Sequence, residues 1–373
     1  MNVAPANNGA TTAAQNKKWT VLLYSASDND LKPYMLDDIN EIETVGSDAY
    51  TNLIAQVDEG RGKGATRYML EKDGDPNRIN SPVLQQLGST NMSDPASLAD
   101  FVEWGIKNYP SEHVMVVLSD HGDGWKGALQ DYSHNGWMDL KNIREGLEEA
   151  QRRTGKKIDV LGFDACLMAS TEVAHELKDT ADYLIASEET EGVDGWHYTN
   201  LLNPNLLKNL KQMQMLKINV EPRELAVLGV RSAEAKQGVL PTMSAVDMAK
   251  VPGVVAAVDR LGRAIVNTTD DVGILKDISS ETQEFTGYKD AYDFAGRVQT
   301  SVRVKDMELR RAAREVKDAV RQAVIAEEHS DEYPNAHGLT LEISRWGTPS
   351  GYTDTKFGQE TSWPQALDKL GGS

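Results

Sequence analysis

The chain has 373 residues, 40% of them hydrophobic, and a formal net charge of −18 at pH 7. This length allows two or three domains. The acidic balance disfavours nucleic acid and anionic membranes as partners and would attract cationic substrates, although solubility alone also accounts for such a charge. No apolar run approaches the roughly 18 residues of a membrane-spanning helix, and a single cysteine excludes an intramolecular disulfide.

Residues 1–18 are small, polar and low in complexity, which is typical of a disordered leader. They lack the positively charged segment and apolar core of an intact secretory signal. A leader that had already been removed would look the same, so the sequence leaves export and localisation open.

The first half of the chain alternates between buried strands and amphipathic helices. Apolar, β-branched runs predict strands at 19–27, 51–60, 65–73, 114–118, 158–163 and 182–189. Apolar residues at helical spacing predict helices over 31–45, 95–108 and 140–153, with Asp94 as the N-cap of the second. This alternation predicts an α/β fold with a mostly parallel sheet between helices.

Beyond residue 200 the signals are weaker. Helical spacing predicts helices over 201–216, 251–267, 288–301 and 307–328. Apolar runs predict strands at 225–232 and 338–344 and a strand-to-helix junction at 240–247. We therefore expect a leader at 1–18, an α/β domain at 19–204 and a C-terminal α/β or helical subdomain at 205–373 that could continue the same sheet.

Two of the predicted strands end in polar turns that carry reactive side chains. The strand at 158–163 is followed by the only cysteine, Cys166, and the strand at 114–118 is followed by His121. If both strands belong to one parallel sheet, the thiol and the imidazole lie at the same edge, where open α/β sheets bind ligands. A helix starting at Ser170 or Thr171 would also favour the thiolate. Taken alone, a single cysteine is more often a small buried hydrophobic residue.

Three blocks in this order carry a family resemblance: SDHGDGW, GFDACLMAS and ASEETEGVDGW, each at the end of a predicted strand. They resemble the clostripain-like cysteine peptidases of the caspase, legumain and gingipain superfamily. The resemblance also covers residues 19–31, 240–251 and 336–343, and so spans most of the chain. It implies a caspase-like fold and a cysteine endopeptidase that cleaves peptides or proteins after Arg or Lys.

The resemblance also implies roles for individual residues. Cys166 would be the nucleophile and His121 the proton donor of a Cys-His dyad. The N–H groups of Gly122 and Cys166 would form the oxyanion hole. The family pattern requires no third catalytic residue, although Asp120 or Asp123 could orient the imidazole.

Acidic residues near the predicted nucleophile point to the substrate preference. Asp164 and Asp194 match positions that line a pocket for the basic P1 side chain in the family, and a carboxylate binds a guanidinium strongly. Both could instead be ordinary turn residues or helix caps. Possible walls of the same cleft are Trp125, Ser187, Glu188 and Trp196.

The histidines show no paired metal-ligand spacing, so we predict no metal site and no required cofactor. The acidic cluster at 188–194 leaves calcium open, although the spaced oxygen ligands of a recognisable calcium loop are missing. Relatives are often activated by self-cleavage at a basic residue after the catalytic histidine, but residues 127–140 contain none. Cleavage would then occur elsewhere, for instance at 59–64, or the enzyme would act as a single chain.

Two other hypotheses remain at this stage. The same thiol could serve an amidase or acyltransferase, or the fold could be a non-catalytic binding module. The sequence gives neither the physiological substrate nor the oligomeric state.

Overall fold

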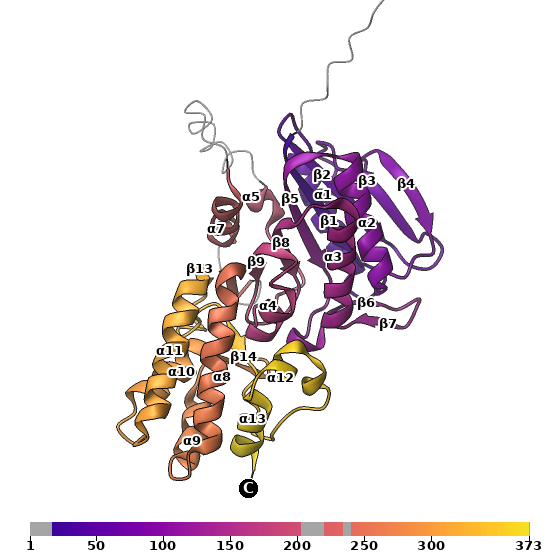
Figure 1. Ribbon diagram of the computed structural model, residues 1–373. Helices are drawn as coiled ribbons and strands as arrows, with labels where there is room; N and C mark the ends of the chain where they lie inside the picture. The colour runs from indigo at the N-terminus through magenta and orange to yellow at the C-terminus, as the bar shows by residue number, and fades with distance from the viewer. Residues whose placement is uncertain (1–16, 203–219, 234–239, 373) are drawn as a thin grey trace, which may run out of the picture.

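A nine-stranded sheet organises the computed structural model, which describes residues 17–202, 220–233 and 240–372 (Figure 1). The strand order is β13-β10-β9-β8-β5-β1-β2-β3-β4. Five central strands run parallel: β2 (Thr51–Asp58), β1 (Lys17–Ser25), β5 (Ser111–Ser119), β8 (Ile158–Asp164) and β9 (Ala181–Ala186). Antiparallel strands complete the edges: β3 (Ala65–Met69), β4 (Val83–Gly88), β10 (Thr242–Asp247) and β13 (Val324–His329).

The central strands are covered on both faces, which explains their continuous apolar sequences. Helices α1 (Lys32–Val45), α5 (Tyr198–Leu201) and α7 (Pro222–Ser232) contribute to a core on one face. The core on the other face is larger and includes α2 (Pro95–Asn108), α3 (Leu140–Thr154) and α4 (Thr171–Leu177). The predicted α/β fold, with a large sheet between helices, is confirmed.

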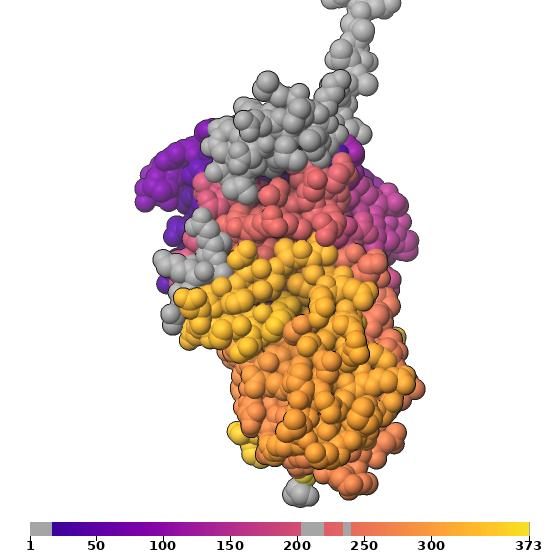
Figure 2. Space-filling model, turned by 90° about the vertical axis from the view of Figure 1, so that its left-hand side faces the viewer, coloured from indigo at the N-terminus to yellow at the C-terminus, as the bar shows by residue number. Residues whose placement is uncertain are grey.

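The C-terminal part extends the larger core. It comprises α8 (Val251–Asn267), α9 (Val272–Glu281), α10 (Ala291–Thr300), α11 (Met307–Ala323), α12 (Lys356–Glu360) and α13 (Trp363–Gly371). A small sheet of β11 (Glu284–Phe285), β12 (Tyr288–Asp290) and β14 (Thr340–Leu341) lies beside them. Figure 2 shows these orange and yellow segments gathered at the lower end of the molecule. Because β10 and β13 belong to the main sheet, the C-terminal half shares that sheet.

Most predicted strands and helices of the first half are confirmed, including the N-cap at Asp94, whose side chain accepts a hydrogen bond from the Ala96 N–H. The short hairpin of β6 (Ala128–Asp131) and β7 (Gly136–Met138) was not predicted. The predicted helix at 201–216 lies mostly outside the described residues, as do residues 1–16. The division of the chain into domains stays a prediction.

Three predictions in the second half are wrong in part or whole. Residues 225–232 belong to helix α7, not to a strand, because Pro222 and a capping box between Glu221 and Glu224 start a helix there. The helix predicted at 307–328 ends at Ala323, where the chain continues as β13 and pairs with β10. Residues 288–290 form strand β12, and the helix predicted there begins at Ala291.

No helix in the described part is both long and apolar enough to cross a membrane.

Candidate active site

The turns after β5 and β8 lie in contact at the carboxyl edge of the sheet. The two strands are parallel neighbours, and Ser119 at the end of one pairs with Asp164 at the end of the other. The turns that carry His121 and Cys166 therefore start side by side. A Cβ added to Gly122 would lie 2.4 Å from the carbonyl oxygen of Cys166, so this contact requires a glycine.

Cys166 is partly exposed and follows β8 by two residues. Its Sγ accepts a hydrogen bond from the Glu191 N–H at 3.3 Å. Burial raises the pKa of the Cys166 thiol, and the nearby carboxylates of Asp164 and Glu189 act in the same direction. Helix α4 begins at Thr171 with Ser170 as its N-cap, as predicted. That the N-terminus of this helix favours the thiolate stays a prediction.

The imidazole of His121 is oriented by an acid that sequence reasoning missed. Its Nε2 lies 3.0 Å from Oδ1 of Asp30, in the loop between β1 and α1. The Tyr132 hydroxyl donates to the same oxygen at 2.7 Å. The hydrogen bond from His121 is the larger cause that lowers the pKa of Asp30, and the hydrogen bond from Tyr132 acts in the same direction. Because Nε2 is engaged, Nδ1 is the ring nitrogen left for proton exchange.

The two acids predicted as alternative partners of the imidazole have other partners. Asp120 is buried and accepts hydrogen bonds from the Asn29 side chain and the Gln130 N–H. Asp123 forms an ion pair with Lys126 at 2.8 Å. That prediction is therefore wrong.

Two backbone N–H groups at the contact between the turns have no hydrogen-bond acceptor among the described residues. Within the described residues, neither the Gly122 N–H nor the Cys166 N–H donates a hydrogen bond to another residue. Free backbone N–H groups beside a thiol are what a developing oxyanion requires.

Asp164, two residues before Cys166, has a buried carboxyl group. Asp164 is 6% exposed and accepts hydrogen bonds from the Tyr198 hydroxyl at 2.7 Å and the Trp196 N–H at 3.2 Å. Burial raises the pKa of Asp164 despite these donors. Asp194 is exposed in the loop after β9, and its charge acts on Asp38 of α1.

The model of the clostripain family matches residues 23–369 of this chain. The chain belongs to the clostripain family of cysteine proteases. Clostripain from Hathewaya histolytica is 28% identical over 229 residues, which are 51% of this chain and 42% of that protein. The match thus spans less than half the length of that relative.

Solved structures share the fold. A secreted cysteine protease of Bacteroides thetaiotaomicron has a TM-score of 0.70 at 15% identity, covering 93% of this chain and all of that one (100%). Another structure of a secreted cysteine protease of that organism, in complex with an irreversible peptide inhibitor, has a TM-score of 0.65 at 22% identity and covers 94% and 99% of the two chains.

In this family member, the residues predicted to wall the cleft are buried. Trp125 donates its indole N–H to Glu342 at 3.0 Å and packs edge-on against Tyr352. Ser187 is fully buried against Thr242, and Glu188 accepts from the Gly338 N–H. These three side chains are packed in the interior of the free protein, and their role as possible walls of the cleft stays a prediction. Trp196, 2% exposed, donates its backbone N–H to Asp164 and its indole N–H to Glu191.

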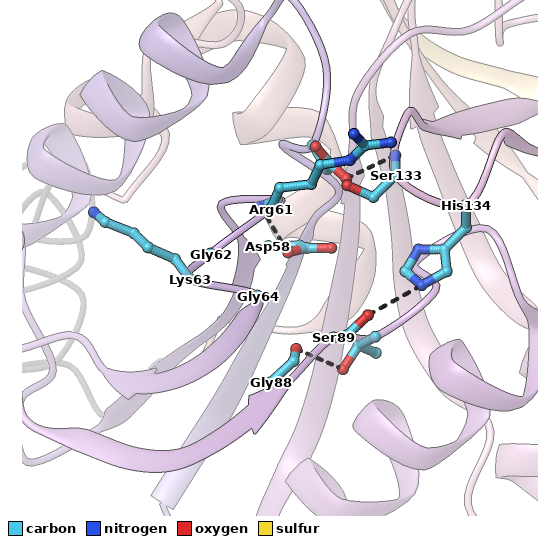
Figure 3. Close-up of a pocket in the computed structure, with 12 residues that line it drawn as sticks. Asp58, Arg61, Gly62, Lys63, Gly64, Gly88, Ser89, Ser133 and His134 are labelled. Carbon is cyan, nitrogen blue, oxygen red and sulfur yellow. Dashed lines mark hydrogen bonds between the residues drawn. The ribbon is translucent and has the colours of Figure 1, made fainter.

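A cavity separate from the turns that carry Cys166 and His121, here termed the second cavity, lies at the same edge of the sheet, between the loop at 59–64 and residues 133–134 (Figure 3). Its volume is about 490 Å³, and Figure 3 shows the Asp58 carboxylate between Arg61 and His134. Burial raises the pKa of Asp58 to about 6. The loop that carries Asp28, another lining residue, also carries Asp30, which places this cavity on the imidazole side of the nucleophile.

Side chains that could together bind a cation occur in two groups in the described part of this protein. Asp28, Asp58 and Asp131 gather by the second cavity, and Glu112, His113 and Glu221 gather at the opposite edge of the sheet. Asp131 accepts from His134 and from the Met92 N–H. The acids at 188–194, where calcium was considered, form no such group among the described residues.

Proposed function

We propose that this family member is a cysteine endopeptidase that cleaves peptide bonds after Arg or Lys, with Cys166 and His121 as its catalytic dyad. The observation that supports the proposal is the backbone contact between the two turns. One turn carries a partly exposed thiol and the other an imidazole held by Asp30, and the N–H groups of Gly122 and Cys166 donate to no other described residue. Hydrolysis of an amide needs a nucleophile, a proton donor and stabilisation of the oxyanion, and this arrangement offers all three.

In the proposed reaction, the Cys166 Sγ attacks the substrate carbonyl carbon while the thiol proton passes to His121 Nδ1. The N–H groups of Gly122 and Cys166 donate to the oxyanion of the tetrahedral intermediate. Its collapse breaks the C–N bond, and the imidazolium protonates the departing amine. Water, deprotonated by the neutral imidazole, then hydrolyses the thioester and regenerates the thiol.

The proposed preference for a basic P1 residue rests on two acidic residues near the thiol, Asp164 and Asp194. Asp164 precedes the nucleophile by two residues, and its buried carboxyl group would attract a cationic side chain and reject an acidic one. Asp194 adds negative charge to the same region. The fold it shares with a protease solved in complex with a peptide inhibitor is compatible with a peptide substrate.

The test measures turnover of peptide reporters with Arg, Lys or Asp at P1 before and after alkylation of the single thiol. Turnover of the Arg and Lys reporters that disappears on alkylation and in Cys166→Ala supports the proposal. Peptide turnover that survives both treatments refutes it. Turnover of small amides without peptides would select the amidase hypothesis, and ordinary thiol reactivity without turnover would select the binding module.

A further inference from the structure

The second cavity lies beyond the imidazole, in the direction that leads away from the thiol. β8, β5, β1 and β2 are successive neighbours in the sheet and run parallel. Their carboxyl ends carry, in that order, the turn of Cys166, the turn of His121, the loop of Asp28 and Asp30, and Asp58. A chain that crosses this edge from the thiol therefore passes the imidazole before it reaches the cavity.

Short contacts connect His121 to the wall of the cavity. His121 Nε2 lies 3.0 Å from Asp30, and the Tyr132 hydroxyl donates to the same carboxylate at 2.7 Å. Two lining residues, Asp28 and Ser133, stand close to these partners in the chain. The Ser133 N–H donates to Asp28 Oδ2 at 2.9 Å, which joins the two segments. The cavity thus begins beside the groups that hold the imidazole.

Two carboxylate oxygens at this cavity have no partner in the described structure (Figure 3). Asp58 is 2% exposed, and its Oδ1 accepts a hydrogen bond from the Gly60 N–H at 2.9 Å. The other oxygen of Asp58, Oδ2, accepts from no described residue. The same holds for Asp28 Oδ1, since the Ser133 N–H donates to Oδ2. The cavity therefore offers acceptor atoms to a bound group.

The cationic side chains around the cavity do not neutralise these acids. Lys63 pairs with Glu59 at 2.6 Å, and His134 pairs with Asp131 at 3.0 Å. Arg61 is exposed and forms no ion pair with another residue of the described part. Buried carboxylates are normally paired, because an unpaired buried charge is costly. A cation from outside the chain would supply the missing partner.

A side chain suits this cavity better than a metal ion does. One oxygen from each of Asp28, Asp58 and Asp131 lies within 4.8 Å of the others. Both oxygens of Asp131 already accept hydrogen bonds, from the His134 N–H and the Met92 N–H. Two free carboxylate oxygens remain, whereas calcium takes roughly six to eight oxygen ligands. The volume of about 490 Å³ is far larger than an ion needs and lies in the range of sites that enclose an organic group.

We propose that the second cavity binds a lysine or arginine side chain of the leaving segment, about three or four residues after the cleaved bond. This inference rests on the proposed function. In the proposed reaction His121 protonates the departing amine, so the leaving segment lies on the imidazole side of the thiol. Three strand spacings separate β8 from β2, roughly 14 Å, which an extended peptide spans in about four residues. Asp58 Oδ2 and Asp28 Oδ1 accept hydrogen bonds from the bound cation.

The first experiment uses the wild-type enzyme and quenched peptides with arginine at P1 and neutral residues elsewhere. A single lysine, or its neutral acetylated form, occupies each of the first four positions after the cleaved bond in turn. At the third or fourth position, kcat/KM should be about ten- to hundredfold higher with lysine, as expected for a charge-assisted hydrogen bond. Mass spectrometry of the products identifies the cleaved bond, so that only cleavage after the P1 arginine is counted.

Asp58→Asn tests the buried acid directly. Asparagine keeps an oxygen that can accept from the Gly60 N–H, so the loop retains its hydrogen bond. The ratio of kcat/KM for lysine and acetyl-lysine peptides cancels any loss of folded enzyme, and it should fall about tenfold in this variant. Glu145→Gln, which removes an exposed charge on α3, should leave the ratio unchanged. Assays at pH 8 keep Asp58 ionised, because burial raises its pKa only to about 6.

The outcomes separate this inference from the proposed function. A lysine-to-acetyl-lysine ratio near one at every position, or an undiminished ratio in Asp58→Asn, would overturn the inference while cleavage after the P1 arginine persists. A preference for lysine that millimolar calcium abolishes and EDTA restores would show that the acids bind a metal ion, and it would also overturn the inference. Failure to cleave any of the peptides after arginine or lysine would instead refute the proposed function.

Discussion

His121 Nε2 and Asp30 Oδ1 lie 3.0 Å apart, although 91 positions separate the two residues in the chain. The contact joins the loop after β1 to the turn after β5, and β1 and β5 are neighbours in the sheet. An imidazole held at Nε2 presents Nδ1 in a fixed direction, so Asp30 would act on the reaction by positioning His121.

Asp30→Ala should therefore lower kcat about ten- to hundredfold while KM changes little, since Asp30 contacts the imidazole and neither Asp164 nor Asp194. Asp30→Asn keeps an acceptor oxygen without the charge and should fall between Ala and wild type. Tyr132→Phe, which removes the hydroxyl that holds Asp30, should show a smaller loss in the same direction. Steady-state kinetics with a P1-Arg reporter measure kcat and KM separately. An unchanged kcat in Asp30→Ala would contradict the positioning role.

The raised pKa of the Cys166 thiol predicts slow alkylation of the free protein. Only the thiolate reacts, so the rate with iodoacetamide should reach its half-maximum at a higher pH in the folded protein than in the unfolded one. The chain unfolded in urea is a matched control, because Cys166 is its single cysteine. A folded-state profile at or below the unfolded one would show that the thiolate is already favoured at rest.

Gly122→Ala should abolish most activity without unfolding the protein. Its new Cβ would lie 2.4 Å from the Cys166 carbonyl oxygen and would separate the two turns. Displacement by even an ångström of groups that must align in the transition state can cost about a hundredfold in rate. Gly253→Ala on α8 is the control: nothing lies within 4 Å of its added Cβ, and alanine favours the helix. Retained kcat/KM in Gly122→Ala would mean that close contact between the turns is not needed.

The sequence predicted the central strands well because strands buried on both faces appear as continuous apolar runs, as in Val114–Leu118. Helix α7 was mistaken for a strand because the run of Leu, Ala and Val at 225–230 suits either structure. The capping box at Glu221 and Glu224 was the signal that would have corrected it. At Val324 the helical pattern continues, but pairing of β13 with β10 overrides it.

The candidate site was predictable only where its residues lie in sequence motifs. Cys166, His121 and Asp164 follow strands directly, and the parallel sheet aligns them. Asp30 reaches the site through a contact between distant segments, and an isolated acid in a chain with 57 acidic residues carries no signal of its own.

The proposed chemistry uses a thiol, an imidazole and backbone N–H groups, so we expect EDTA to leave kcat/KM unchanged within about twofold. Turnover of a P1-Arg reporter, with and without added calcium, measures this. A loss on chelation that calcium reverses would contradict the expectation. Asp58→Asn should then reproduce the loss, because Asp58 belongs to the acidic group beside the second cavity.

Glu172 on α4 should make stability depend on pH. It is 1% exposed and accepts hydrogen bonds from the Tyr352 hydroxyl and the Glu342 N–H, while burial raises its pKa from 4.5 to about 7. The folded protein therefore keeps a proton that the unfolded chain releases between these pH values. Stability is full below pH 4.5, falls as the pH rises towards 7 and stays lower above it, by about 3 kcal/mol from this group.

Glu172→Gln isolates that contribution, because glutamine cannot ionise. The difference in unfolding free energy between wild type and Glu172→Gln should shift by about 3 kcal/mol in favour of the variant between pH 4.5 and pH 8. Urea denaturation at both pH values measures the shift. Glu145→Gln is the control for an exposed acid, and its stability should follow wild type across the range. Parallel curves for wild type and Glu172→Gln would mean that Glu172 is already ionised in the folded protein at the lower pH.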